Sequence, residues 1–157
     1  MKKLLVIALT ACFSCFGVFG QNNDEVILNT QGKYVDSDGG LLTGSLTSYF
    51  ANGEVEAVFN VTDGVKDGAM TVYYMGGSTK ETGTYNNGKK SGEWFSYTEN
   101  GKLESVAFFK NDQKHGTWKV WDANGVLRSE MHYKNGIRTG VWRTFDETGK
   151  LTESVKY

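Results

Sequence analysis

Few side chains in this sequence could hold a metal ion. Histidine occurs twice, at His115 and His132, whereas a zinc site needs three or four converging histidine, cysteine or carboxylate ligands. His132 lies two residues after Glu130, so in a strand the two side chains share a face and could make a weak metal contact. His115 stands at a turn position that other polar residues fill elsewhere in the chain. We therefore predict no metal site and no cofactor.

The residue patterns of nucleophilic catalysis and phosphate binding are also absent from the sequence. No G-x-S-x-G elbow exposes a serine nucleophile, and no G-x-G-x-x-G loop precedes a helix. Paired acids, such as Glu54 with Glu56 or Asp146 with Glu147, are typical of solvated faces and turns. A catalytic site usually breaks the local rules of its scaffold, and no segment here does so. The sequence predicts a protein that is not an enzyme.

A row of cations is the first periodic feature with a functional interpretation. The row recurs every 24 residues and consists of Lys66, Lys90, Lys114 and Arg138. If two strands separate successive members, the charges align along one sheet edge at roughly 10 Å intervals. Such a basic edge could meet anionic lipid headgroups, polysaccharide or an acidic protein. It could equally be solvated charge that protects the edge.

Two aromatic columns recur with the same interval. The first column holds Trp94, Trp118 and Trp142. The second, three residues later in each unit, holds Tyr97, Trp121 and Phe145. A spacing of three puts the columns on opposite faces of a strand unless the strand is bent or bulged. A single-layer sheet cannot cover both faces, so one column could line an exposed groove that binds proteins or sugars; alternatively, both columns pack as core.

The elements that position these side chains form a 24-residue repeat. One glycine column consists of Gly44, Gly68, Gly92, Gly116 and Gly140, and a second of Gly53, Gly77, Gly101, Gly125 and Gly149. No insertion or deletion breaks this register. A fixed period of this length is the signature of stacked repeat architectures.

Each unit predicts two strands and two turns. In one unit a short strand covers 93–97, a turn covers 99–101, and a second strand covers about 102–109. Asn-Gly and Asp-Gly pairs between apolar runs indicate tight hairpin turns, because both residues tolerate positive φ. We find no helical periodicity after the leader. We therefore predict an all-β fold: an extended, twisted, single-layer antiparallel meander of β-hairpin repeats without disulfides.

The expected organisation has three parts. Residues 1–20 form a leader, residues 21–43 form an N-terminal segment with a partial capping repeat, and residues 44–157 form five repeats. A cap is expected at the first edge because an open edge strand invites aggregation.

The leader has the features of a secretory signal peptide. A short basic start is followed by an apolar run to about Phe19, and the sequence turns polar at Gln21. Cys12 and Cys15 both lie inside this run, so their C-x-x-C spacing is not interpreted as a redox or metal pair. The alternative is a lipoprotein, with Cys12 lipidated at its Leu-Thr-Ala-Cys sequence. Either way we predict an exported protein, periplasmic, associated with the outer membrane or secreted, and not transmembrane once the leader is removed.

The segment from Tyr85 to Leu103 resembles the MORN-repeat variant (membrane occupation and recognition nexus). The shared pattern is an aromatic residue, N-G, a basic residue, G-x-W-x-x-Y and N-G-x-L. The pattern recurs from Tyr133 to Leu151, and from Phe109 to Leu127 with an aspartate replacing the turn glycine. The two N-terminal units depart from it, with leucine and methionine where tryptophan is expected.

This resemblance implies an extended antiparallel sheet of hairpins. It also implies a non-catalytic module that contacts proteins or membranes. Some secreted bacterial proteins with such repeats carry an antitoxin-like family label, which fits poorly with an exported chain.

Composition and charge narrow the function classes. The chain has 157 residues with 13% aromatic residues, 20 glycines and no proline, which fits a folded core joined by many tight turns rather than disorder. The formal net charge of −1 excludes the strongly basic footprint of a general nucleic-acid binder. Acidic residues concentrate in 21–63, whereas the remainder is mildly basic.

We therefore expect an exported, non-catalytic scaffold that contacts an unidentified protein through an aromatic groove. The alternative is association with the cell envelope, in which the basic edge binds anionic lipid or polysaccharide.

Overall fold

The computed structural model of the chain describes residues 18–19 and 26–157. The predicted leader lies almost entirely outside the described residues, as do both of its cysteines. No cysteine occurs in 26–157, so that part of the fold contains no disulfide. The described residues include no helix long and apolar enough to cross a membrane.

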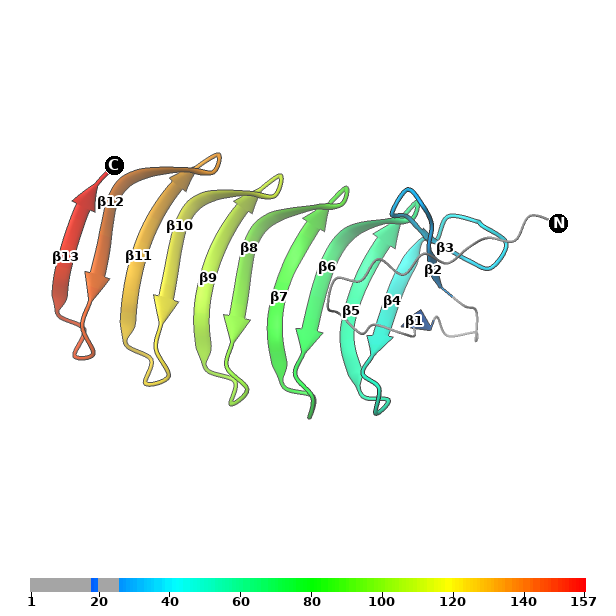
Figure 1. Cartoon of the computed structure of the whole chain (residues 1–157), viewed down its shortest axis with the longest axis horizontal. Coiled ribbons are helices and arrows are strands. Elements are labelled where there is room, and N and C mark those ends of the chain that lie inside the picture. Colours follow the sequence, from blue (N-terminus) through cyan, green and yellow to red (C-terminus); the bar gives the residue numbers. More distant parts are fainter. Residues whose placement is uncertain (1–17, 20–25) are drawn as a thin grey trace.

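Ten strands follow one another in chain order and pair antiparallel with their neighbours (Figure 1). They are β4 (Gly44–Tyr49), β5 (Val55–Thr62), β6 (Val65–Tyr73), β7 (Thr79–Asn86), β8 (Lys89–Tyr97), β9 (Leu103–Lys110), β10 (Gln113–Trp121), β11 (Leu127–Lys134), β12 (Ile137–Phe145) and β13 (Leu151–Lys156). The sheet is open and elongated, and β1 (Val18–Phe19) pairs with the outer side of β4. The predicted all-β meander of hairpins is confirmed.

Two kinds of turn alternate along the sheet. The tight turns place both central residues at positive φ, as in Asn87 (47°) and Gly88 (80°), which is the geometry that Asn-Gly sequences favour. The wider turns each close with a backbone hydrogen bond, such as the one from Gly101 N to Thr98 O at 2.8 Å. All tight turns lie along the upper side of the sheet in Figure 1, here called the tight-turn rim, and the others form the wide-turn rim.

Each strand that follows a tight turn from β6 to β12 contains a bulge at its glycine. In β8, Ser91 pairs with Thr84 and Phe95 pairs with Thr82, so residues 92–94 lie opposite Gly83 alone. Gly92 has a φ of 74° there. Equivalent shifts occur in β6, β10 and β12. Because of the extra residues, the side chain two positions after the glycine lies over the neighbouring strand; in β8 this side chain is Trp94.

The most buried cluster lies at the N-terminal end of the sheet. It consists of Leu46, Ala57, Phe59 and Val61, and Val26, Tyr34 and Leu42 pack against it. Strands β2 (Ile27–Leu28) and β3 (Tyr34–Val35) form a separate small hairpin in this N-terminal segment. Residues 26–43 therefore cover one sheet face at this end. We call that face, which also carries Trp94, the ring face.

Candidate functional site

The two aromatic columns lie on different faces of the sheet. Strand β8 pairs with β9 without interruption from Gly92 to Ser96, and the irregularity that follows adds its extra residue, Glu104, to β9 rather than to β8. Alternation along β8 is therefore unbroken and places Trp94 and Tyr97 on opposite faces. Strands β10 and β12 pair with their following strands in the same way. The six candidate groove residues therefore do not line one common groove: the tryptophan column lies on the ring face, and Tyr97, Trp121 and Phe145 lie on the opposite face.

On the ring face the tryptophans join a continuous ladder of seven rings. The ladder runs through Tyr85, Trp94, Phe109, Trp118, Tyr133, Trp142 and Tyr157. Adjacent ring centroids are 4.9–6.2 Å apart, and the rings are tilted or edge-on. These geometries are the favourable ones for aromatic pairs. We call this the ring ladder.

The rings of the ladder are not equally buried. Trp94 is 2% exposed, whereas Trp118 and Trp142 are half-buried and Tyr157 is 49% exposed. Trp94 sinks deepest because Gly83 lies beneath it, where a Cβ would come within 2.2 Å of the indole. Trp94 thus serves packing, and accessible ring surface begins at the following units.

The indole N–H groups show the same difference. Trp118 Nε1 donates to Phe108 O and Trp142 Nε1 donates to His132 O, both at 3.0 Å. Trp94 Nε1 is buried without a hydrogen-bond partner in the described structure. Because an unpaired buried donor costs free energy, the packing and cation contacts of the Trp94 ring have to offset that cost.

The predicted basic row lies directly on the ring ladder. Lys90 Nζ is 3.7 Å from the centroid of Trp94, Lys114 Nζ is 4.3 Å from that of Trp118, and the Arg138 guanidinium carbon is 4.6 Å from that of Trp142. Each cation also lies 5.0–5.4 Å from the next ring, namely Phe109, Tyr133 and Tyr157. Lys66 approaches Phe59 and Tyr85 in the same manner. The cation row and the tryptophan column are therefore one surface.

Two of these cations remain available to a partner. Lys90 forms an ion pair with Glu81 at 3.5 Å and is partly buried. Lys114 and Arg138 are exposed, and within the described residues neither makes an ion pair. Arg138 instead donates to the Tyr157 hydroxyl at 3.3 Å. The cation–π contacts fix the positions of these charges while leaving them unneutralised.

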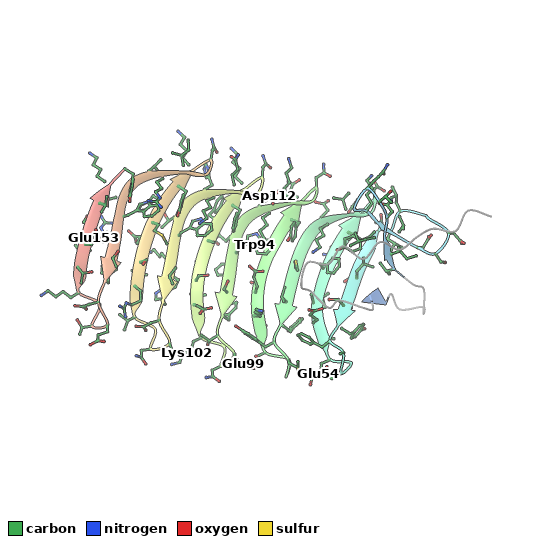
Figure 2. All side chains as sticks on the ribbon, in the orientation of Figure 1. Glu54, Trp94, Glu99, Lys102, Asp112 and Glu153 are labelled. Atoms are coloured by element: carbon green, nitrogen blue, oxygen red, sulfur yellow. The ribbon has the colours of Figure 1, made fainter. Side chains whose placement is uncertain are left out.

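The tight-turn rim as a whole is basic from β7 onwards. The three tight turns between β7 and β12 carry six cations, which are Lys89, Lys90, Lys110, Lys114, Lys134 and Arg138, against the single acid Asp112. Asp112 lies at this rim in Figure 2, and its carboxylate accepts from Lys90 N at 2.8 Å. Two other lysines of the rim, Lys110 and Lys134, each stand one residue after a ladder ring and so point to the opposite face.

On the opposite face, Glu130 is the centre of an ionic cluster. Arg143 Nη1 lies 2.6 Å from one carboxylate oxygen, and Lys119 Nζ lies 3.5 Å from the other. Partial burial works to raise the pKa of Glu130, but the hydrogen bond from Arg143 and the charge of Lys119 outweigh it and lower the pKa. His132 also approaches, at 3.6 Å. The carboxylate that could have assisted His132 with a metal is thus engaged by two cations.

His115 has a structural role at the tight-turn rim. Its Nδ1 accepts a hydrogen bond from Asn135 N of the next unit at 3.3 Å, and its ring lies 6.0 Å from Phe108. Asp67 accepts from Asn87 N in the equivalent position. No group of three or more potential metal ligands occurs in the described part of the chain.

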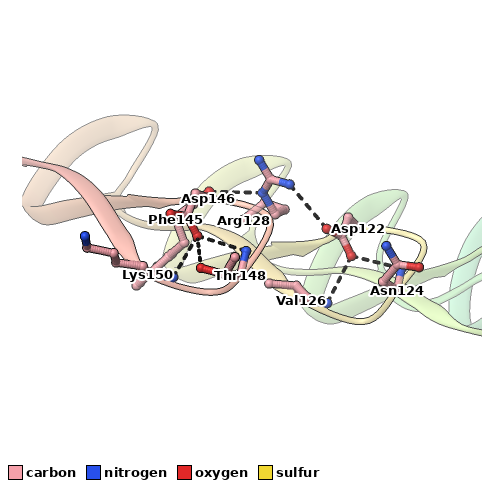
Figure 3. Close-up of polar contacts among 8 residues, drawn as sticks. All are labelled: Asp122, Asn124, Val126, Arg128, Phe145, Asp146, Thr148 and Lys150. Carbon is pink, nitrogen blue, oxygen red and sulfur yellow. Dashed lines mark hydrogen bonds and ion pairs between the residues drawn. The ribbon is translucent and has the colours of Figure 1, made fainter.

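Side-chain carboxylates organise the wide-turn rim (Figure 3). Asp122 Oδ1 accepts from the backbone N of Asn124 and Val126, at 2.9 and 3.0 Å. Asp146 repeats the arrangement in the next unit. Arg128 bridges the two turns by donating to Asp122 Oδ2 and to Phe145 O. These contacts lower the pKa of both aspartates: the bond from Val126 N contributes most for Asp122, and the bond from the Thr148 side chain contributes most for Asp146.

The comparison with protein families matches three consecutive segments of the chain. Residues 90–111, 114–135 and 138–157 each match the model described as MORN repeat variant. These three units are MORN repeat variants. Each matched MORN repeat begins at a cation of the row and includes the tryptophan beneath it. MORN repeats form scaffolds that are generally non-catalytic and that often bind membranes or proteins. No curated protein matches the chain.

Sequence reasoning missed the four partner rings of the ladder, Tyr85, Phe109, Tyr133 and Tyr157, as part of this surface. The signal is present: each cation and its tryptophan are four residues apart, an even spacing that keeps both on one strand face. The cross-strand register then places each cation beside a ring of the neighbouring strand; Lys114, for example, lies opposite Phe109.

Proposed function

We propose that the chain is an exported, non-catalytic MORN-repeat scaffold that binds a protein partner on the ring face of its C-terminal repeats. The single observation that carries this proposal is the ring ladder with its seated cations. Aromatic and cationic side chains are the groups that dominate protein interfaces, because they combine large contact area with strong polar contacts. Here they recur at fixed spacing with little competing charge.

The N-terminal end of the ring face supports the same interpretation. There the face is covered by residues 26–43, with Tyr34 packed on Phe59 at a centroid distance of 5.3 Å. From Trp118 onwards the rings are half-buried or exposed. At the N-terminal end, the chain covers its own ring face with residues 26–43. The C-terminal repeats leave the same kind of aromatic surface open to a partner.

The test is capture from the host's envelope extract with residues 21–157 as bait, in three matched forms. The first is the wild type, the second carries Lys114→Gln with Arg138→Gln, and the third carries Lys110→Gln with Lys134→Gln. Both double variants remove two positive charges from the same rim, but only the second removes charges that stand on rings. A partner retained by the third form and lost by the second supports the proposal. A partner retained by all three contradicts it.

A second candidate function is association with an anionic envelope surface, either lipid or polysaccharide. The excess of cations along the tight-turn rim favours it, since clustered charge attracts polyanions. It predicts binding that falls steeply with salt and weakens equally in both double variants, because such attraction depends on total charge rather than on ring contact. Sedimentation with anionic vesicles and with purified polysaccharide, at low and high salt, distinguishes this candidate from the first.

A further inference from the structure

We propose that the occupant of the ring face is an extended acidic peptide in the polyproline II conformation, with a carboxylate at every third residue. This inference rests on the proposed protein-binding function and specifies the partner's chemistry. It follows from three properties of the surface: the charge that is unneutralised, the interval between charges and the rings that lie between them.

The charge requires an acidic partner. Lys114 and Arg138 are exposed and unpaired among the described residues, and the tight turns of this region contribute one acid against six cations. Because each cation is already held between two rings, binding a carboxylate there loses little side-chain freedom. A preorganised charge of this kind gives a larger net gain than a flexible surface lysine.

The interval between charges determines the period of the partner. Successive cations belong to strands β8, β10 and β12, which are two strand positions apart, so they recur at about 9.6 Å. Polyproline II advances about 3.1 Å per residue with three residues per turn, so its side chains at i, i+3 and i+6 share one face at about 9.3 Å intervals. A β-strand covers a similar distance in three residues, but its alternation turns every other acid away from the surface.

The rings supply the second part of the recognition. Phe109 lies between Lys90 and Lys114, and Tyr133 lies between Lys114 and Arg138, whereas Tyr157 lies beyond Arg138. These three rings alternate with the tryptophans in the ring ladder. Aromatic surfaces bind polyproline II segments because the conformation is already extended in the free peptide and costs little entropy. The two residues between successive acids would meet these rings, and proline suits both positions.

The covered N-terminal end sets the length of the site. Residues 26–43 pack on the ring-face cluster of β4 and β5, which leaves the row open from Lys90 to Arg138. Lys114 and Arg138 take the acids at i+3 and i+6, and an acid at i reaches Lys90, whose charge is shared with Glu81. The recognised core is therefore at most seven residues long.

The experiment measures binding of three labelled heptapeptides to residues 21–157 by fluorescence anisotropy at low salt. The first is Glu-Pro-Pro-Glu-Pro-Pro-Glu. The second, Pro-Pro-Glu-Glu-Glu-Pro-Pro, has the same composition and charge but clusters its acids. The third, Glu-Gly-Gly-Glu-Gly-Gly-Glu, keeps the spacing but lacks the preformed conformation. The proteins are the wild type and the two double variants defined above, each checked for folding by circular dichroism.

We expect the first peptide to bind the wild type about tenfold more tightly than the second or third, which corresponds to roughly 1.4 kcal/mol. Lys114→Gln with Arg138→Gln should abolish this preference, and Lys110→Gln with Lys134→Gln should leave it. Equal affinity for the spaced and clustered peptides overturns the inference, as does binding to anionic vesicles with none to any peptide. If the peptides fail in either way but the capture experiment still finds a partner that depends on Lys114 and Arg138, the proposed function stands and only the acidic-peptide inference fails. The two failures are therefore distinguishable.

Discussion

At the residue scale, the cations of the row do more than carry charge. Lys90 stands 3.7 Å above the Trp94 ring and also pairs with Glu81, so it stabilises the fold from one strand to the next. Arg138 makes the equivalent ring contact without an ion pair. A cation at the same repeat position thus stabilises the fold at one end of the row and remains available for binding at the other.

Glu130 is the residue with the clearest pH dependence. Its lowered pKa means that its ionised form is favoured in the folded protein, so its stabilising contribution is complete above the ordinary glutamate pKa of about 4.3 and is lost as the pH falls through the lowered value. Glu130→Gln should therefore destabilise the protein by about 1 kcal/mol at pH 7 and by much less near pH 3. Urea unfolding of both proteins at the two pH values measures this, and an equal difference at both would contradict the cluster's role.

At the element scale, the bulge at each repeat glycine decides how deeply a tryptophan packs. The bulge lays the indole across the neighbouring strand, and the residue beneath it sets the depth. Under Trp94 that residue is Gly83, whereas in the next unit the corresponding position is Ala107, which pairs with Trp94 from the other side. Trp94 thus lies between Gly83 and Ala107, whereas Trp118 lies between Ala107 and Met131, so smaller residues flank the more deeply buried indole.

Gly83→Ala should destabilise the protein by about 1–3 kcal/mol, because the new methyl would force the Trp94 ring off the strand. The backbone itself accepts alanine, since Gly83 does not have a positive φ. Thermal unfolding measures the effect, and Ala107→Gly is the matched change in the opposite direction. A double variant with Trp94→Leu should recover part of the loss; if the two changes are simply additive, the steric explanation fails.

The wide turns depend on their aspartates in two separable ways. Asp122→Asn keeps the oxygen that caps the backbone N–H groups of the turn but loses the ion pair with Arg128, whereas Asp122→Ala loses both. We expect the melting temperature to fall in the order wild type, Asp122→Asn, Asp122→Ala. Acidification should reduce the gap between the wild type and Asp122→Asn, because the lowered pKa of Asp122 makes its charge stabilising only above that pKa.

At the scale of the whole molecule, stability is unevenly distributed along a nearly one-dimensional array. Each hairpin of the sheet contacts mainly its neighbours, so local opening can occur without global unfolding. The buried cluster of Leu46, Ala57, Phe59 and Val61 lies under residues 26–43 at one end. At the other end Leu151 and Tyr157 are 47% and 49% exposed.

Amide hydrogen exchange should therefore show a gradient, slowest in β5 and fastest in β12 and β13. Mass spectrometry of peptic fragments would measure it. Uniform protection along the sheet would indicate a single cooperative unit and would contradict this description. Binding of the period-three acidic peptide should slow exchange in β10 and β12 and leave β5 unchanged.

The sequence by itself determined the architecture, because glycines and Asn-Gly pairs in unbroken 24-residue register specify where every hairpin turns. It also determined that a spacing of three separates Trp94 from Tyr97, since alternation along a strand is a local property. The basic row and the tryptophan column were both visible in the sequence as periodic columns, but as two separate features rather than one surface.

Only the tertiary structure decided that Lys90, Lys114 and Arg138 stand on the ring ladder, because cross-strand register and the bulge at each glycine are properties of paired strands. The same holds for the burial of Trp94, which depends on a glycine eleven residues away on the adjacent strand. It holds too for residues 26–43, which lie on the ring face through contacts such as Tyr34 with Phe59. The contacts of Trp94 with Gly83 and of Tyr34 with Phe59 join residues of different strands, and only the pairing and packing of those strands bring them together.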